Sequence, residues 1–137
     1  KNNKNILDIL HKLDLIKHVD LLGRVNDVKE VLIKNDVSIL TSQSEANPNA
    51  ISESMAAGIP CIATNVGDCA DMLNGEGWIC STGNANSISL AIESAFNEFY
   101  SNKEKWNNRK LRCYENARKR YSQECIEEKF NKIMRSL

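Results

Sequence analysis

The sequence lacks any apolar run close to the ~20 residues that a helix needs to cross a lipid bilayer. It also shows no signal peptide, no internal repeat and no low-complexity tract. Hydrophobic residues still make up 42% of its 137 positions, which is enough to bury a real core. These features predict one soluble domain in the cytoplasm.

Sequence arrangements typical of a metal centre are missing. No Asp-x-Asp motif occurs, and the two histidines, His11 and His18, have no nearby Cys or Asp arrangement that suggests a metal site or a catalytic triad. The five cysteines are an odd number without metal-type spacing. We therefore expect no metal, no cofactor and reduced thiols, which fits a cytoplasmic protein.

A charge excess of either sign is missing as well, because 18 Lys and Arg balance 18 Asp and Glu. The distribution is uneven: residues 1–96 carry 7 basic and 12 acidic residues, or −5, and residues 97–137 carry 11 and 6, or +5. The cluster Arg118-Lys119-Arg120 is suited to an anionic membrane surface or nucleic acid. Few aromatic residues accompany it, so we predict a solvated helix face and no nucleic-acid partner, with peripheral membrane contact as the alternative.

Apolar periodicity predicts alternating helices and strands, which is typical of an α/β fold with a Rossmann-like parallel sheet and helices on both faces. The expected helix caps are Asp27, either Ser87 or Asn86, and Ser122. In the last helix, Ile126, Phe130, Ile133 and Met134 are expected to face inward. The predicted strands are Val19–Leu22, Val37–Thr41, Cys61–Thr64 and Trp78–Cys80, and the predicted helices are Asn5–Ile16, Val28–Lys34, one ending at Gly58, a turn or short helix at Asp68–Leu73, Asn86–Tyr100, Lys103–Tyr121 and one after Ser122.

The stretch from Leu40 to Pro60 carries the candidate chemistry. An apolar strand ends in hydroxyl residues, a turn containing Pro48 follows, and a helix begins. Ligands of parallel α/β sheets bind beyond the carboxyl ends of the strands, where the first N–H groups of the next helix attract anions. The N–H groups around Asn49 to Ile51 are therefore candidates for a phosphate.

Two carboxylates, Glu45 and Glu53, bracket this corner. A hydrogen bond to a charged acceptor is worth roughly 1.5–3 kcal/mol, and a vicinal diol such as a ribose suits such an acceptor. The alternative is that Glu53 only complements the helix dipole, worth about 0.3–1 kcal/mol, and that Glu45 is a solvated loop residue.

The surrounding motif resembles the donor-site signature of GT-B glycosyltransferases, in particular the family of retaining nucleotide-sugar transferases numbered four, or glycosyl transferases group 1. Leu22-Gly23-Arg24-Val25, Asp36-Val37 and Val66-Gly67 are similar to that family too. The motif itself reads Ser44-Glu45-x-x-Pro48-Asn49-Ala50-x-x-Glu53-x-Met55-Ala56-Ala57-Gly58-x-Pro60-x-x-Ala63-Thr64.

The resemblance implies a role for each position. Glu53 would bind the ribose hydroxyls, the amides of Asn49, Ala50 and Ile51 the distal phosphate, and Glu45, the candidate catalytic residue, the hydroxyls of the transferred sugar. Arg24 and Val25 would flank the base, and Asn47 and Pro48 complete the donor-binding loop. The implied reaction is metal-independent transfer, with retained configuration, from a nucleotide sugar to an acceptor such as a polysaccharide or a lipid-linked glycan.

The chain departs from the family pattern at three positions. The family usually has Gly and then a bulky residue after the first Glu, where this chain has Ala46 and Asn47. It usually has two glycines where Gly67 is followed by Asp68. Since Ala tolerates positive φ less readily than Gly, these changes bear on the geometry of the loop and on which sugar fits.

The resemblance assigns residues 1–121 to part of the donor-binding domain, the C-terminal half of a GT-B fold with its first strands missing. It assigns 122–137 to a C-terminal helix that packs back toward an N-terminal, acceptor-binding domain. We therefore expect an N-terminally truncated chain that is inactive alone, leaves Val19–Leu22 without regular partners and self-associates. The alternatives are a non-catalytic sugar-nucleotide-binding or scaffold module and half of a sugar-nucleotide epimerase.

Overall fold

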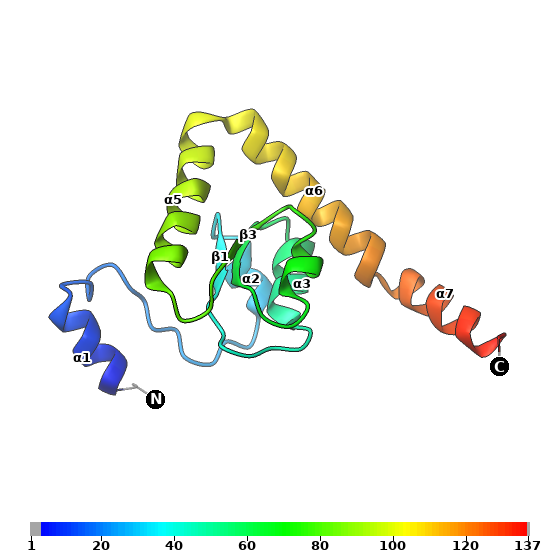
Figure 1. Cartoon of the computed structure of the whole chain (residues 1–137), viewed down its shortest axis with the longest axis horizontal. Helices are drawn as coiled ribbons and strands as arrows, with labels where there is room; N and C mark the ends of the chain where they lie inside the picture. The colour runs from blue at the N-terminus through cyan, green and yellow to red at the C-terminus, as the bar shows by residue number, and fades with distance from the viewer. Residues whose placement is uncertain (1–3, 137) are drawn as a thin grey trace.

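The computed structural model describes residues 4–136 and shows the predicted alternation of helices and strands (Figure 1). All three strands of these residues are parallel, and β2 lies between β1 and β3. The elements are α1 Lys4–Lys12, α2 Val28–Leu32, β1 Ser38–Leu40, α3 Asn49–Ala56, β2 Cys61–Thr64, α4 Cys69–Leu73, β3 Trp78–Cys80, α5 Ala85–Ser101, α6 Lys103–Tyr121 and α7 Gln123–Met134.

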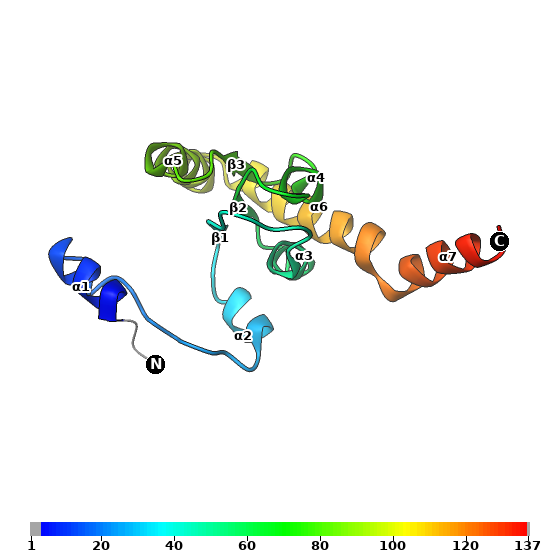
Figure 2. The same ribbon diagram turned by 60° about the horizontal axis from the view of Figure 1, so that its bottom comes forward.

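The central strand β2 is buried on both faces, and its side chains alternate between two layers of the core. Cys61 and Ala63 pack with α3, α4 and α6, whereas Ile62 packs with α5. Figure 2 shows α3 and α5 on opposite sides of the sheet. The prediction of a parallel α/β sheet with helices on both faces is therefore confirmed.

A buried ion pair fixes the corner between α5 and α6. The Arg109 guanidinium donates from Nε and Nη2 to the two carboxylate oxygens of Glu98, over 2.6 and 2.9 Å, and stacks 4.5 Å from the centre of the Trp78 ring. Lys105 adds a second salt bridge to Glu98, of 2.8 Å. The hydrogen bonds from Arg109, more than any other contact, lower the pKa of Glu98 to about 2.

The prediction for Val19–Leu22 is wrong, since these residues are not a strand. The expectation that they lack regular partners is confirmed, because no strand pairs with them within residues 4–136, and a segment without a partner strand has no ladder to join. The first helix is also shorter than predicted, because α1 ends at Lys12 and turns follow, including Asp14 at a φ of 54°. In α5 the cap is Asn84, whose side chain accepts a hydrogen bond from the Ser87 amide, and not Ser87 or Asn86.

The prediction for the last helix is partly wrong. Ser122 caps α7 as predicted, by accepting a hydrogen bond from the Cys125 amide. The apolar face of α7 does not point inward, however, because the helix extends away from the sheet (Figure 1). Its exposed apolar residues are Ile126, Phe130, Ile133 and Met134.

Four of the five thiols are buried, and all five are free. Burial raises the pKa of the Cys61 thiol to about 11 and that of Cys113 to about 12. Among residues 4–136, no helix is both long and apolar enough to span a membrane. The same residues hold no cluster of His, Cys, Asp and Glu suited to a metal ion.

Candidate functional site

The loops that follow the three parallel strands meet at the carboxyl edge of the sheet. The Thr64 hydroxyl, at the end of β2, donates to the Ser42 carbonyl in the loop after β1, over 2.6 Å. The Asn65 amide donates to the carbonyl of Cys80 at the end of β3. This edge is where ligands of parallel α/β sheets bind.

Glu45 is held in place within the first of these loops. Its carboxylate is half-buried and accepts a hydrogen bond of 2.7 Å from the Ser42 hydroxyl. Thr64 anchors the backbone of the same Ser42, so that β2 supports the residue that orients Glu45. Glu45 is therefore not fully exposed to solvent.

Gly67, in the loop after β2, lies directly against the peptide backbone of the Glu45 loop. A Cβ at this position would meet the carbonyl oxygens of Glu45 and Ala46 at 2.2 and 2.5 Å, and the Gly67 φ is +49°. Both the close approach and the left-handed backbone require glycine here. The next residue, Asp68, donates its amide to the Ala46 carbonyl and accepts a hydrogen bond from the Asn47 side chain.

The first turn of α3 leaves backbone N–H groups available. Pro48 is the N-cap, in extended conformation, and no side chain caps this end of the helix. The Ile51 amide donates to the Pro48 carbonyl over 3.1 Å, while the amides of Asn49 and Ala50 have no partner within residues 4–136. Two of the three amides assigned to a phosphate are therefore free, and the third is engaged.

Glu53 lies in the second turn of α3 and faces α2. It is exposed and lines a groove of about 380 Å³, whose other lining residues are mostly apolar. Lys29 of α2 is the cation in this groove. The remaining lining residues are Val28, Leu32, Ile33, Ala56 and Ala57.

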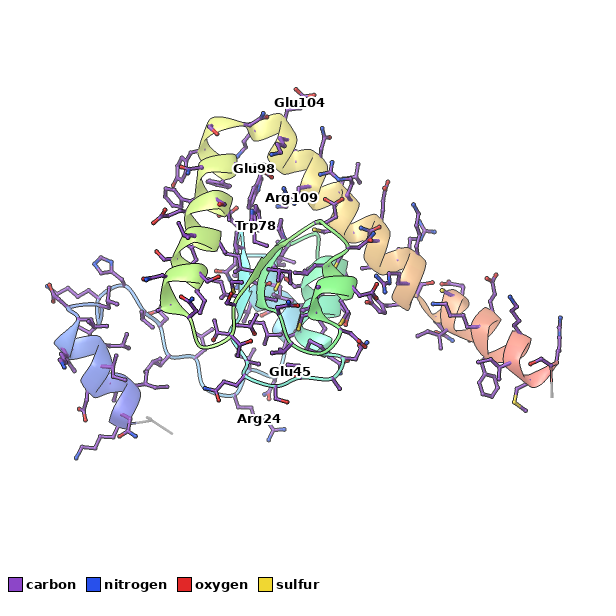
Figure 3. All side chains as sticks on the ribbon, viewed as in Figure 1. Arg24, Glu45, Trp78, Glu98, Glu104 and Arg109 are labelled. Carbon is purple, nitrogen blue, oxygen red and sulfur yellow. The ribbon has the colours of Figure 1, made fainter. Side chains whose placement is uncertain are left out.

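Arg24 and Val25 lie in the segment before α2. Arg24 is exposed and Val25 is half-buried. Figure 3 shows Arg24 and Glu45 at the same end of the molecule, far from the corner that carries Glu98 and Arg109. Within the described residues, Arg24 forms no salt bridge with Glu45 or Glu53.

Residues 1–120 match the model of the family described as glycosyl transferases group 1. The chain belongs to this family.

Two curated proteins are similar to parts of the chain. It is 31% identical over 86 residues to N-acetyl-alpha-D-glucosaminyl L-malate synthase from Bacillus anthracis, covering 61% of this chain and 23% of that protein. It is 41% identical over 54 residues, 39% of this chain and 14% of the relative, to the Escherichia coli UDP-Gal:alpha-D-GlcNAc-diphosphoundecaprenol alpha-1,3-galactosyltransferase. The chain thus spans less than a quarter of the length of either enzyme.

The structure of Anabaena HepE in complex with UDP is similar in fold, with a TM-score of 0.88 at 20% identity. The match covers 98% of this chain and 36% of HepE. It supports the GT-B glycosyltransferase architecture expected from the motif.

The sequence did not indicate the contacts of several residues that shape the site. Thr64 and Gly67 belong to the motif that carried the resemblance, yet their contacts with the Glu45 loop follow only from the structure. Asp68 was recognised as a departure from the family pattern, without its bond to Asn47. These contacts join segments about twenty residues apart, which no local spacing reveals.

Proposed function

We propose that the protein is a retaining glycosyltransferase that takes a sugar from a nucleotide-sugar donor, and that this chain supplies the donor-binding part. The observation that carries the proposal is the α3 corner, where free amides of Asn49 and Ala50 follow a loop that holds Glu45 in place. Such amides, together with the helix dipole, favour a phosphate. The similarity in fold to a structure with bound UDP supports a nucleoside diphosphate as the ligand.

Each proposed contact uses a group whose position is described above. The two free α3 amides receive the distal phosphate, Glu45 accepts from hydroxyls of the transferred sugar, and Glu53 accepts from the ribose. Arg24 and Val25 flank the base, while Asn47 and Pro48 shape the loop. Transfer is then favoured by orientation of the donor and by stabilisation of the negative charge that develops on the leaving diphosphate.

For the acceptor we propose a class of molecule. A polysaccharide or lipid-linked glycan is proposed because one relative's name includes a diphosphoundecaprenol-linked sugar. The acceptor would be bound by a part of the full-length protein other than this chain. The five free cysteines, four of them buried, support the proposed cytoplasmic location.

The test is a screen of the full-length protein with UDP-glucose, UDP-galactose, UDP-N-acetylglucosamine and GDP-mannose, scored for hydrolysis and for transfer. Glu45→Ala should lower turnover more than it lowers affinity for the bare diphosphate, because its proposed contact is to the sugar. Glu104→Gln, at the far end of the molecule (Figure 3), is a matched control that should change neither. Binding of nucleotide sugars without turnover would instead support a non-catalytic binding module.

A further inference from the structure

Two exposed polar side chains, Asn47 and Asp68, tie together the loops that follow β1 and β2. The Asn47 amide nitrogen Nδ2 donates to Oδ2 of Asp68 over 3.3 Å. The backbone amide of Asp68 donates to the carbonyl of Ala46 over 2.9 Å. One aspartate thus holds its neighbouring loop through both its side chain and its backbone.

The pair lies directly beside the residue proposed to contact the sugar. Asn47 is two residues after Glu45, and Gly67, which precedes Asp68, lies against the Glu45 and Ala46 carbonyls. Both carboxylates, Glu45 and Asp68, also contribute to the raised pKa of the Cys69 thiol, after the larger effect of burial. The two loops therefore form one small unit at the sheet edge.

Among the residues that the structure describes, this bond is the one side-chain hydrogen bond that either Asn47 or Asp68 makes. Arg120 is a nearby cation, but it does not take the place of Asn47 as the partner of Asp68. Its guanidinium is bonded to the side chain and carbonyl of Asp71.

We propose that Asn47 and Asp68 are a pair of positioning residues, which hold the loop so that Glu45 meets the transferred sugar. This inference rests on the proposed function of Glu45. The pair itself does not touch the reacting atoms. Its loss should therefore affect the use of the sugar-bearing donor and leave the binding of the bare diphosphate, at the α3 amides, unchanged.

The experiment measures kcat/KM for the nucleotide sugar selected by the screen, and the affinity for its bare diphosphate, on the full-length protein. Asp68→Ala and Asn47→Ala should each lower kcat/KM roughly five- to tenfold, with diphosphate affinity within about twofold of wild type. The double variant should be no worse than either single variant, because both remove one bridge. Glu104→Ala, which removes an exposed carboxylate at the opposite end of the molecule (Figure 3), is the matched control and should change neither quantity.

Conservative variants separate positioning from a general loss of structure or charge. Asp68→Asn keeps an oxygen that accepts from Asn47, so it should retain most of the activity. The exchanged pair, Asn47→Asp with Asp68→Asn, reverses the donor and the acceptor and should also recover activity. The melting temperature of every variant should stay within about 2 °C of wild type, since both residues are exposed.

Three results would overturn the positioning role: full kcat/KM in Asp68→Ala, an equal loss of diphosphate affinity, or a double variant whose losses simply add. If Glu45→Ala lowers turnover and Asp68→Ala does not, only the pair fails. If Glu45→Ala itself has no selective effect, the proposed role of Glu45 fails and the role of the pair fails with it.

Discussion

Glu53 is the residue for which a ligand role and a helix-dipole role make different predictions. If its carboxylate accepts from a ribose, Glu53→Gln should weaken donor binding by about 1.5–3 kcal/mol, or roughly 10- to 150-fold, because a neutral amide is a weaker acceptor. Isothermal titration calorimetry with UDP on the full-length protein measures this change.

Glu104→Gln is the control for the loss of one exposed carboxylate, because Glu104 lies at the opposite end of the molecule (Figure 3). Unchanged UDP affinity in Glu53→Gln, together with a small loss of stability, would favour the helix-dipole role. The groove between α2 and α3 would then have no nucleotide function.

Glu98 makes stability depend on acid pH. Its pKa falls from an ordinary value of 4.5 to about 2 in the folded state, mainly through the hydrogen bonds from Arg109. A carboxyl group with a lowered folded-state pKa stabilises the protein above its unfolded pKa, and this contribution disappears as pH falls from about 4.5 toward 2. We expect the contribution to be on the order of 3 kcal/mol at neutral pH.

Urea denaturation at pH 7 and at pH 3 tests this expectation with wild type and Glu98→Gln. The free energy of unfolding of the variant should be lower at pH 7 and should fall less between the two pH values. Equal pH dependence in both proteins would show that Glu98 titrates normally.

At the scale of elements, the sequence predicted strands β2 and β3 and helix α6 best. Their bounds match the prediction, because short apolar runs and a long periodic stretch leave few alternatives. Val19–Leu22 has three apolar residues out of four, yet a strand also needs a neighbouring strand, which is not a property of its own residues. The prediction for α7 failed for a related reason, since an amphipathic face does not specify what covers it.

The candidate site was predictable in its composition and less so in its geometry. The motif placed Glu45 and the α3 amides at the sheet edge, where the structure has them. It did not indicate that the Ile51 amide bonds to Pro48, or that Asp68 reaches Asn47, because these contacts depend on how the backbone turns and on which loops meet.

The exposed face of α7 leads to a prediction about this 137-residue chain. Phe130 is 60% exposed, so Phe130→Ser should change the free energy of unfolding by less than about 0.5 kcal/mol. Trp106 is 1% exposed, and Trp106→Ala should cost roughly 3–5 kcal/mol. Urea denaturation compares the two variants, and a loss above about 1 kcal/mol in Phe130→Ser would contradict the detached position of α7.

The same substitution tests the proposed division at residue 122. If residues 122–137 pack against another domain in the full-length protein, Phe130→Ser should destabilise that protein and not the shorter chain. Equal, small effects in both would remove the support for such packing.

At the scale of the whole molecule, the unpaired edge of strand β1 bears on what this chain can do alone. β1 has a partner on one side only among residues 4–136, and such an edge invites association. Beside it, Ile39, Phe96 and Tyr100 are 50%, 59% and 69% exposed, and they line a hollow of about 230 Å³. A surface of this kind is typical of an interface.

We therefore predict that this 137-residue chain alone self-associates and shows no transferase activity. Light scattering during gel filtration should give a mass that rises with protein concentration. Phe96→Lys should reduce this rise, because it places a charge beside the open edge, whereas Phe130→Lys on α7 is the matched control away from that edge. A transfer assay with the screened nucleotide sugars should detect product from the full-length protein and none from this chain. Robust transfer by the chain alone would show that activity needs no partner at the β1 edge or at the hollow beside it. The proposed dependence on other parts of the full-length protein would then be wrong.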